Sequence, residues 1–328
     1  MIITGESESK MDTAIVVLLF VAGLVLIIKG GDWFVDSAVW IANITGIPKF
    51  IVGATIVSMC TTLPELTVSL LGVVDGEYDM AVGNAVGSVT ANIGLIMGIS
   101  LVCIPSAVKR GSFWLKATLM SLAAALLWLL CRGGRLEFLP SIILLVILAV
   151  YIYDNIRDAK KNIGTEAVDA ADKKDAPKMI VLFVVGVAAI VGGSQLLITY
   201  GSKLAALLGV PAAIIGVTMV AIGTSLPELI TTLTAIRKKE ASMSVGNIIG
   251  ANVIDLALIL PVCSLVSEGS LTIGRQSYAL DMPVCFGMTL LAILPPIITG
   301  KTHRLQGILM LVGYAAYIVV LVTKFGVA

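Results

Sequence analysis

Long apolar runs separated by short polar breaks recur along the whole chain. They lack the alternation over about ten residues that marks a transmembrane β-strand. A helix needs about 20 mostly apolar residues to cross about 30 Å of hydrocarbon. Ten such spans are predicted, near residues 13–42, 47–74, 79–104, 113–131, 138–154, 178–207, 211–236, 241–266, 278–298 and 304–324. The pattern therefore predicts an all-α, polytopic membrane protein with ten transmembrane helices.

The two halves of the chain repeat each other at a constant offset. Residues 53–70 (GATIVSMCTTLPELTVSL) match residues 216–233 (GVTMVAIGTSLPELITTL), and MAVGNAVGS at 80–88 matches MSVGNIIGA at 243–251. Five spans per half is an odd number, so the second half enters the membrane from the opposite side. We expect two inverted five-helix repeats. Their predicted extents are 1–154 and 178–328, joined by a cytoplasmic linker at 155–177.

Composition narrows the possible partners. Of 328 residues, 58% are hydrophobic and 13% are charged, and the formal net charge is +1. This balance offers no basic field for nucleic acid. The five cysteines are scattered without a C-x-x-C pair, so neither a disulfide framework nor a zinc site is predicted. We expect membrane lipid and inorganic cations as partners, with no cofactor and no obligate protein partner.

Basic residues set the expected orientation. Lys and Arg concentrate after the odd-numbered spans, for example Lys109, Arg110 and Lys116 after the third and Arg237 and Lys238 after the seventh. Positively charged loops stay in the cytoplasm. We therefore expect a multi-pass protein of the cell (inner) membrane with both termini outside the cytoplasm.

Each half carries the motif T-[TS]-L-P-E inside an otherwise apolar span. The proline lacks an N–H and clashes with the carbonyl four residues earlier, which frees that carbonyl. The threonine lies four residues before the glutamate, on the same face of a continuous helix. Such oxygens suit hard cations, and two carboxylates suit a divalent ion such as Ca²⁺. The residues are Thr61, Pro64 and Glu65 in the first half and Thr224, Pro227 and Glu228 in the second.

The glutamates have two interpretations. An unpaired carboxylate at mid-membrane is unfavourable by several kcal/mol, so two at equivalent positions are difficult to explain as structural. In the alternative, each glutamate is protonated or hydrogen-bonded and pins a helix kink.

The third and eighth spans add the motif G-N-x-x-G. Asn84 matches Asn247 there, and the glycines allow close approach of helix backbones. Further along each span, Asn92 aligns with Asp255, a third membrane acid without a duplicate charge. We expect these four side chains to support the site.

At these residues the chain resembles the Ca²⁺/cation antiporter superfamily, specifically its prokaryotic sodium/calcium exchanger branch. The resemblance covers both motifs in both halves and the ten-span layout, so nearly the whole chain. It implies a calcium-type site of Thr61, Glu65, Thr224 and Glu228. It implies sodium-type positions, shared with the two glutamates, at Ser58, Thr62, Ser88, Ala221 and Ser225, with backbone carbonyls coordinating at Ser58 and Ala221. Asn92 and Asp255 resemble the family's middle polar pair.

The resemblance implies an antiporter that exchanges Ca²⁺ for Na⁺ by alternating access, with the long first and sixth spans moving past a fixed core. Ala251 stands where the repeat would supply the hydroxyl of Ser88, so a proton-coupled calcium/cation exchanger is the alternative. A channel is disfavoured because two convergent carboxylates would hold a divalent ion too tightly for rapid flow. The chain has no H-E-x-x-H, G-x-S-x-G or nucleotide-binding motif, so no enzyme is predicted.

Overall fold

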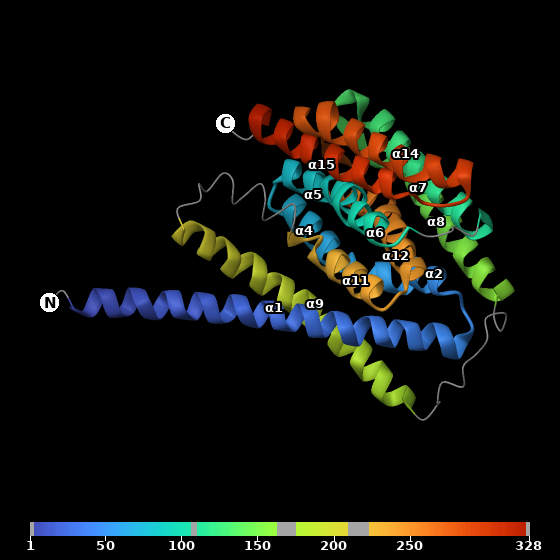
Figure 1. The fold of residues 1–328 in the computed structure, drawn as a ribbon. Helices are drawn as coiled ribbons and strands as arrows, with labels where there is room; N and C mark the ends of the chain where they lie inside the picture. The colour runs from blue at the N-terminus through green and yellow to red at the C-terminus, as the bar shows by residue number, and fades with distance from the viewer. Residues whose placement is uncertain (1–2, 106–109, 163–174, 209–222, 326–328) are drawn as a thin grey trace.

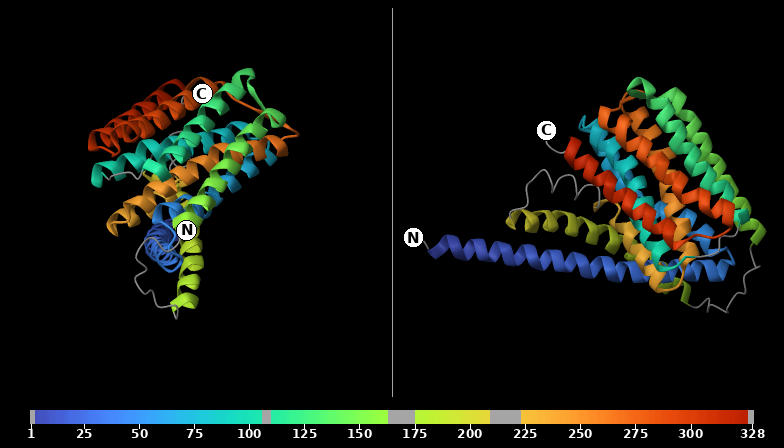
Figure 2. Two further views of the ribbon diagram at one scale, coloured as in Figure 1. Left: turned by 90° about the vertical axis from the view of Figure 1, so that its right-hand side faces the viewer. Right: turned by 45° about the horizontal axis from the view of Figure 1, so that its top comes forward.

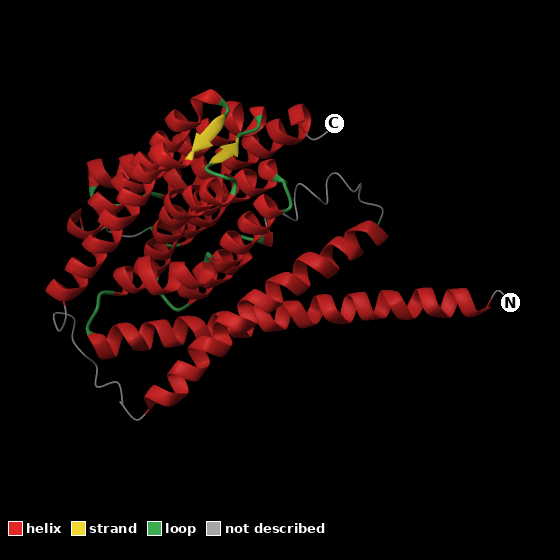
Figure 3. Ribbon diagram, turned by 180° about the vertical axis from the view of Figure 1, so that it is seen from behind, coloured by secondary structure: helices red, strands yellow, loops and turns green. Residues whose placement is uncertain are grey.

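A computed structural model describes residues 3–105, 110–162, 175–208 and 223–325. Within these ranges the chain is helical apart from turns and two short strands (Figure 3). The first half contains α1 (Ile3–Thr45), α2 (Lys49–Val52), the π-helix η1 (Gly53–Val57), α3 (Ser58–Thr61), α4 (Leu63–Val74), α5 (Tyr78–Ala91), the π-helix η2 (Asn92–Met97), α6 (Gly98–Cys103), α7 (Arg110–Leu130), the 3₁₀ turn η3 (Cys131–Gly133), β1 (Arg135–Glu137) and α8 (Phe138–Asn162). The second half contains α9 (Ala176–Leu207), α11 (Leu226–Arg237), α12 (Ala241–Ile254), the π-helix η5 (Asp255–Ile259), α13 (Leu260–Val266), β2 (Ser270–Thr272), the π-helix η6 (Ser277–Asp281), α14 (Met282–Thr299) and α15 (Arg304–Phe325).

Eight helical segments of the described chain are long and apolar enough to cross a membrane. A ninth span consists of Lys49–Thr61 and Leu63–Val74, which are bent by 40° at their junction. These nine coincide with nine of the ten predicted spans. The first part of the remaining one, residues 211–222, lies outside the described residues, and α11 forms its described end. The arrangement is that of the expected polytopic, all-α membrane protein.

Three details differ from the sequence-based expectation. Helix α1 begins at Ile3, ahead of the predicted start near residue 13, and runs for 43 residues. Helix α8 continues to Asn162, so the start of the predicted linker is helical. Lys116, counted with the cytoplasmic loop residues, lies within α7 and has no exposed surface. Its buried charge is compensated by Asp154 and Asp158 of α8, which each accept a hydrogen bond from its Nζ at 2.7 Å.

Helices α1 and α9 cross each other along one side of the bundle, and α1 extends beyond it (Figures 1 and 2). Glycines make the crossing close: a Cβ on Gly30 would lie 2.9 Å from the Gly186 carbonyl oxygen, and one on Gly193 would lie 2.9 Å from that of Gly23. Gly23 and Gly30 are the repeat equivalents of Gly186 and Gly193. The two longest helices therefore meet through matching surfaces.

The described parts of the repeats agree in local structure. Helices α4 and α11, α5 and α12, and η2 and η5 begin at equivalent positions. Even the turn after α4 recurs after α11: Gly76 (φ 80°) corresponds to Lys239 (φ 62°), although positive φ is unfavourable for a lysine. The N–H of Glu77 donates to the Gly72 carbonyl at 2.7 Å, as that of Glu240 does to Ala235. The duplication seen in sequence is thus a duplication of conformation.

The two repeats interleave at the centre, where α12 crosses α2 and η1 at backbone contact. A Cβ on Gly53 would lie 2.2 Å from the Met243 carbonyl oxygen, and one on Gly246 would lie 2.1 Å from that of Phe50. At one end of the bundle, β1 pairs with β2 in antiparallel register and joins the α7–α8 and α13–η6 loops. The core helices therefore form one body built from both halves.

We expect Gly53→Ala and Gly246→Ala each to reduce thermal stability strongly, because the new methyl meets backbone atoms that cannot rotate away. Overpacking of this kind costs about 1–3 kcal/mol or more. The check is the melting temperature in detergent, followed by size-exclusion chromatography. Gly287→Ala is the control, since no described atom lies within 4 Å of its Cβ position. Unchanged melting of both core variants would contradict the contact.

Candidate functional site

The two motif glutamates lie in the first turns of the short helices α4 and α11. Each motif proline occupies that same turn, where its missing N–H leaves no helical bond broken. The chain bends just before α4, at Thr62. Because a helix N-terminus carries partial positive charge, each half-helix favours a carboxylate at this position. The prolines therefore start new helices at the site rather than kinking continuous ones.

Glu65 is 1% exposed, and neither of its carboxylate oxygens has a hydrogen-bond partner in the part of the chain that the structure describes. Its backbone is held firmly: Asn84 Nδ2 donates to the Glu65 carbonyl at 3.0 Å and to Ser69 Oγ at 2.9 Å. Ser69 Oγ in turn donates to the Ala81 carbonyl at 3.1 Å. Asn84 Oδ1 has no partner. The network fixes the helix that carries the acid and leaves its carboxylate available.

Glu228 is equally buried, and its carboxylate oxygens also have no hydrogen-bond partner among the residues described. The hydroxyls of Thr61 and Thr62, from the first repeat, face this carboxylate without forming a hydrogen bond of ordinary geometry. Thr61 Oγ1 lies 3.4 Å from Asn247 Oδ1, and Asn247 Nδ2 donates to Thr231 Oγ1 at 3.2 Å. The site therefore contains oxygens of both repeats.

Thr61 and Glu65 do not lie on one continuous helix, because α3 ends at Thr61 and α4 begins at Leu63 after a bend of 40°. The Thr61 hydroxyl lies near residues of the second repeat, Asn247 and Glu228. That Thr61 and Glu65 face the same volume stays a prediction.

Of the predicted sodium-type positions, the four that the structure describes are buried: Ser58, Thr62, Ser88 and Ser225. Thr62 Oγ1 donates to the Ser58 carbonyl at 2.7 Å. Ser88 Oγ and Thr224 Oγ1, from opposite repeats, lie 3.4 Å apart. Ser225 is 4% exposed, and its hydroxyl has no partner among the described residues. Neutral hydroxyl oxygens such as these are suitable ligands for a monovalent cation.

The missing hydroxyl at Ala251 makes the site asymmetric. The mirror image of the Ser88–Thr224 contact would pair Ala251 with Thr61, and alanine cannot form it. Ala251 is fully buried, and Thr61 instead interacts with Asn247. Ala221, the other predicted position of the second half, lies outside the described residues.

Asn92 and Asp255 occupy equivalent positions at the first residues of the π-helices η2 and η5. Asn92 Nδ2 donates to Asn252 Oδ1 at 3.0 Å, across the boundary between repeats. Asp255 is 1% exposed, and within the described ranges no group forms a hydrogen bond with either of its carboxylate oxygens. Both members of the predicted pair are thus buried. The Asn92 amide nitrogen forms a hydrogen bond, whereas the Asp255 carboxylate forms none with the described residues.

The site's electrostatics favour a bound cation. The carboxyl groups of Glu65, Glu228 and Asp255 are close enough to repel one another. Yet no three His, Cys, Asp or Glu side chains of the described residues converge at metal-binding distance. A cation held here would take two carboxylates at most and complete its shell from hydroxyl, carbonyl and amide oxygens. Hard cations such as Ca²⁺ accept such a shell.

Three supporting residues were not anticipated: Ser69, Thr231 and Asn252. The first two lie four and three residues after their glutamates, so a search for polar side chains one turn after each acid would have found them. Asn252 has no polar repeat equivalent, since Val89 occupies that position. Its role depends on the contact between helices, which no spacing in the sequence indicates.

Comparison with known proteins extends over nearly the whole chain. Residues 15–156 and 178–323 match the family described as "Sodium/calcium exchanger protein". An uncharacterized membrane protein of Methanocaldococcus jannaschii is 30% identical and aligns over 90% of this chain and 94% of its own. The sodium/calcium exchanger MaX1 of Methanosarcina acetivorans is 28% identical and aligns over 93% of this chain and 97% of its own. A solved structure of the sodium-calcium exchanger NCX_Mj, soaked with Na⁺ and Sr²⁺, matches with a TM-score of 0.82 at 29% identity, over 94% of this chain and 99% of its own.

We expect Ca²⁺ to raise the melting temperature of the protein, and Glu65→Gln or Glu228→Gln to abolish that rise. A ligand at 100 times its Kd stabilises the folded state by about 2.7 kcal/mol, and a neutral amide removes a charge on which that binding depends. Thermal melting in detergent, with and without Ca²⁺, measures the effect. Glu77 is an exposed acid in a loop, so the control variant Glu77→Gln should retain the full rise in melting temperature with Ca²⁺. A full rise in both site variants would exclude these carboxylates as ligands.

Proposed function

The chain belongs to the sodium/calcium exchanger family, and we propose that it exchanges Ca²⁺ for Na⁺ across the membrane by alternating access. The observation that carries the proposal is the pair of buried glutamates, one from each repeat, whose carboxylate oxygens have no hydrogen-bond partner among the described residues. Each acid lies at a half-helix N-terminus, and Glu228 faces hydroxyls of the first repeat. An ion that satisfies this arrangement must be positive and must be able to leave again.

Calcium would be held by the oxygens of Thr61, Glu65, Thr224 and Glu228. Sodium would use the same two carboxylates with the surrounding sodium-type positions of Ser58, Thr62, Ser88, Ala221 and Ser225. Because the carboxylates are common to both sets, Ca²⁺ and Na⁺ would exclude each other. Such competition at one site is what couples the two fluxes in opposite directions.

Two small pockets lie where α1 meets the core, and each is lined by a residue of the candidate site. One involves α1, α3, α9 and α11, and the other involves α1, η1, α11 and α12. The first is lined by Phe34, Cys60, Thr61, Val187, Ile190, Val191 and Pro227. The second is lined by Val35, Val57, Thr231, Ala235, Met243, Ser244 and Asn247. Each pocket reaches a site residue, so movement of α1 and α9 would open a path to the ions.

Helix α1 is also bound to the core by charge. Arg237 and Lys238, at the end of α11, form ion pairs with Asp32 and Asp36 of α1. All four side chains retain exposed surface, so these pairs are weak and can break as the helix moves. This supports α1 and α9 as the moving part, and the helices that meet at Gly53 and Gly246 (α2, η1 and α12) as belonging to the fixed part.

We further infer a division into residues 1–154, a cytoplasmic linker at 155–177 and residues 178–328, in the cell membrane with both termini outside the cytoplasm. The family match is interrupted at 157–177, which supports the division. The start of α1 and the end of α15 lie at the same end of the bundle, as an even number of spans requires (Figure 1).

The decisive experiment measures ⁴⁵Ca²⁺ uptake by proteoliposomes loaded with Na⁺ and diluted into Na⁺-free medium. We expect rapid uptake, none when choline replaces internal Na⁺, and none when a pH gradient replaces the Na⁺ gradient. Glu65→Gln and Glu228→Gln should reduce the rate by about tenfold to a hundredfold or more, as loss of a charged ligand implies. Uptake driven by the pH gradient alone would instead establish proton coupling.

Single cysteines at positions 77 and 239 test the orientation in a cysteine-free background. The turns that contain these positions are repeat-equivalent, so inverted repeats put them on opposite sides of the membrane. We expect Glu77→Cys to react with an impermeant maleimide added to intact cells and Lys239→Cys to react only after permeabilisation. The reverse pattern would reverse the orientation, and labelling of both from outside would contradict the inverted topology.

A further inference from the structure

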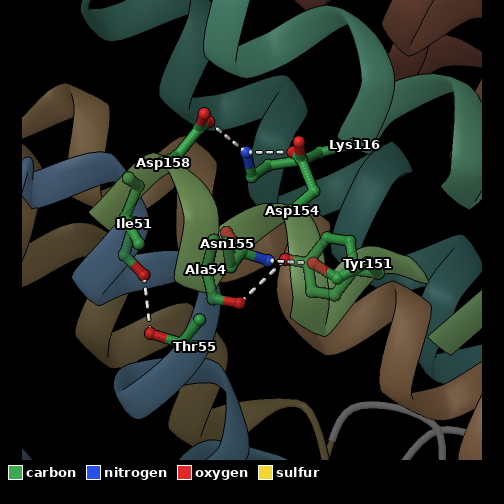
Figure 4. Close-up of polar contacts among 8 residues, drawn as sticks. All are labelled: Ile51, Ala54, Thr55, Lys116, Tyr151, Asp154, Asn155 and Asp158. Carbon is green, nitrogen blue, oxygen red and sulfur yellow. Dashed lines mark hydrogen bonds and ion pairs between the residues drawn. The ribbon is translucent and has the colours of Figure 1, made fainter. Parts of the chain in front are cut away.

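Tyr151 of α8 reaches into the helix that carries the first half of the ion site. Its hydroxyl donates to the Ala54 carbonyl in η1 at 2.8 Å, and the side chain is 2% exposed (Figure 4). Ala54 lies one turn before Ser58, the first residue assigned to the site. Helix α8 itself contributes no ligand, so this contact links a peripheral helix to the ion-binding segment.

The Ala54 carbonyl needs this donor because η1 is a π-helix. In an α-helix the Ser58 N–H would donate to Ala54, four residues earlier. In η1 the Ser58 N–H instead donates to the Gly53 carbonyl, five residues earlier, and the next backbone N–H donates to the Thr55 carbonyl, so both pass over Ala54. A buried carbonyl deprived of its helical donor requires another partner, and the Tyr151 hydroxyl supplies it.

The π-turn matters for the site because it contains one extra residue. One residue corresponds to about 100° of rotation around a helix axis. Without the π-turn, Ser58 and Thr62 would face different neighbours. Glu65 is less affected, because α4 begins separately after the break at Thr62. The π-turn therefore sets the direction of the hydroxyl and carbonyl oxygens more than that of the carboxylate.

Helix α8 is fixed well enough to position Tyr151. Asp154 and Asp158, on the turns after Tyr151, both bind the fully buried Lys116 of α7 at 2.7 Å (Figure 4). Asn155 Nδ2 donates to the Tyr151 carbonyl at 2.9 Å. The lysine thus clamps α8 to α7 close to the residue whose hydroxyl enters η1.

The other side of the Ala54 carbonyl is closed by α12. A Cβ on Gly250 would lie 2.7 Å from the Ala54 oxygen and 2.4 Å from Ser58 Oγ. The glycine lets the two repeats approach, and the carbonyl is enclosed between Tyr151 and α12. The second half carries Tyr314 at the position equivalent to Tyr151. The residues equivalent to η1 there, 216–220, lie outside the described residues.

We propose that Tyr151 is a positioning residue for sodium binding: its hydrogen bond to Ala54 maintains the π-turn that orients Ser58 and Thr62. The inference rests on the proposed exchange of Ca²⁺ for Na⁺ and adds a determinant outside the ligand set. It acts on two sodium-type positions, Ser58 and Thr62, and on one calcium-type hydroxyl, that of Thr61, more than on the carboxylates that both ions share.

The test compares Tyr151→Phe with Tyr153→Phe, which removes the same hydroxyl from an exposed position on the same helix. In proteoliposomes, Tyr151→Phe should raise the Na⁺ concentration for half-maximal Ca²⁺ release by about tenfold, the effect of one buried hydrogen bond. Half-saturation by Ca²⁺ should change less than threefold, or about 0.65 kcal/mol, and the maximal rate should be retained. Tyr153→Phe should match the parent in all three quantities.

Each outcome decides the proposal. A parent protein without Na⁺-dependent Ca²⁺ release would refute the proposed function itself. Normal release by the parent with unchanged Na⁺ half-saturation in Tyr151→Phe would refute the positioning role, even if the melting temperature falls. If Na⁺ and Ca²⁺ binding weaken equally in Tyr151→Phe, Tyr151 stabilises the fold without a specific role in sodium binding, and the proposal is refuted. If the variant cannot be reconstituted, the rise of its melting temperature with Na⁺ and with Ca²⁺ in detergent gives the same comparison.

Discussion

The burial of two carboxylates without internal partners is the constraint on which the rest of this structure depends. Glu65 and Glu228 are each 1% exposed, and no donor in the described chain binds their oxygens. Charge at membrane depth is expensive, so the fold must reduce that cost while leaving the oxygens available to an exchangeable ion. Their mutual repulsion when both are ionised adds to the affinity for a cation.

Several local features follow from that constraint. Both acids lie at the N-termini of half-helices that begin with proline, where partial positive charge favours them. The Asn84 and Asn247 amides bind the surrounding backbone and hydroxyls rather than the carboxylates. The protein thus fixes the positions of the acids without neutralising them, as a site that must bind and release ions requires.

The structure also departs from strict two-fold symmetry around the acids. Ser88 meets Thr224, whereas Ala251 cannot meet Thr61, and Asp255 replaces the amide of Asn92. Away from the acids, the buried Lys116 binds two aspartates of α8, and Tyr151 donates a hydrogen bond to the π-turn of η1. The duplicated helices have the same backbone arrangement in both halves, and the side chains that differ between the halves give each half a different set of oxygens for binding ions.

The sequence by itself determined the membrane class, the duplication, the inverted repeats and the two glutamates. The length of the apolar spans indicates a membrane protein, the constant offset shows the duplication, and the odd number of spans per half predicts the inversion. The glutamates stand out because a buried charge in a membrane is unfavourable. Tertiary structure decided the rest. The direction of the Thr61 hydroxyl depends on the bend at Thr62, and the burial of Lys116 depends on two acids far along the chain. Asn252 and Tyr151 matter only through contacts between helices. Spacing along one helix gives the face of a side chain only while that helix is continuous and α-helical; breaks, π-turns and crossings are set by what packs against it.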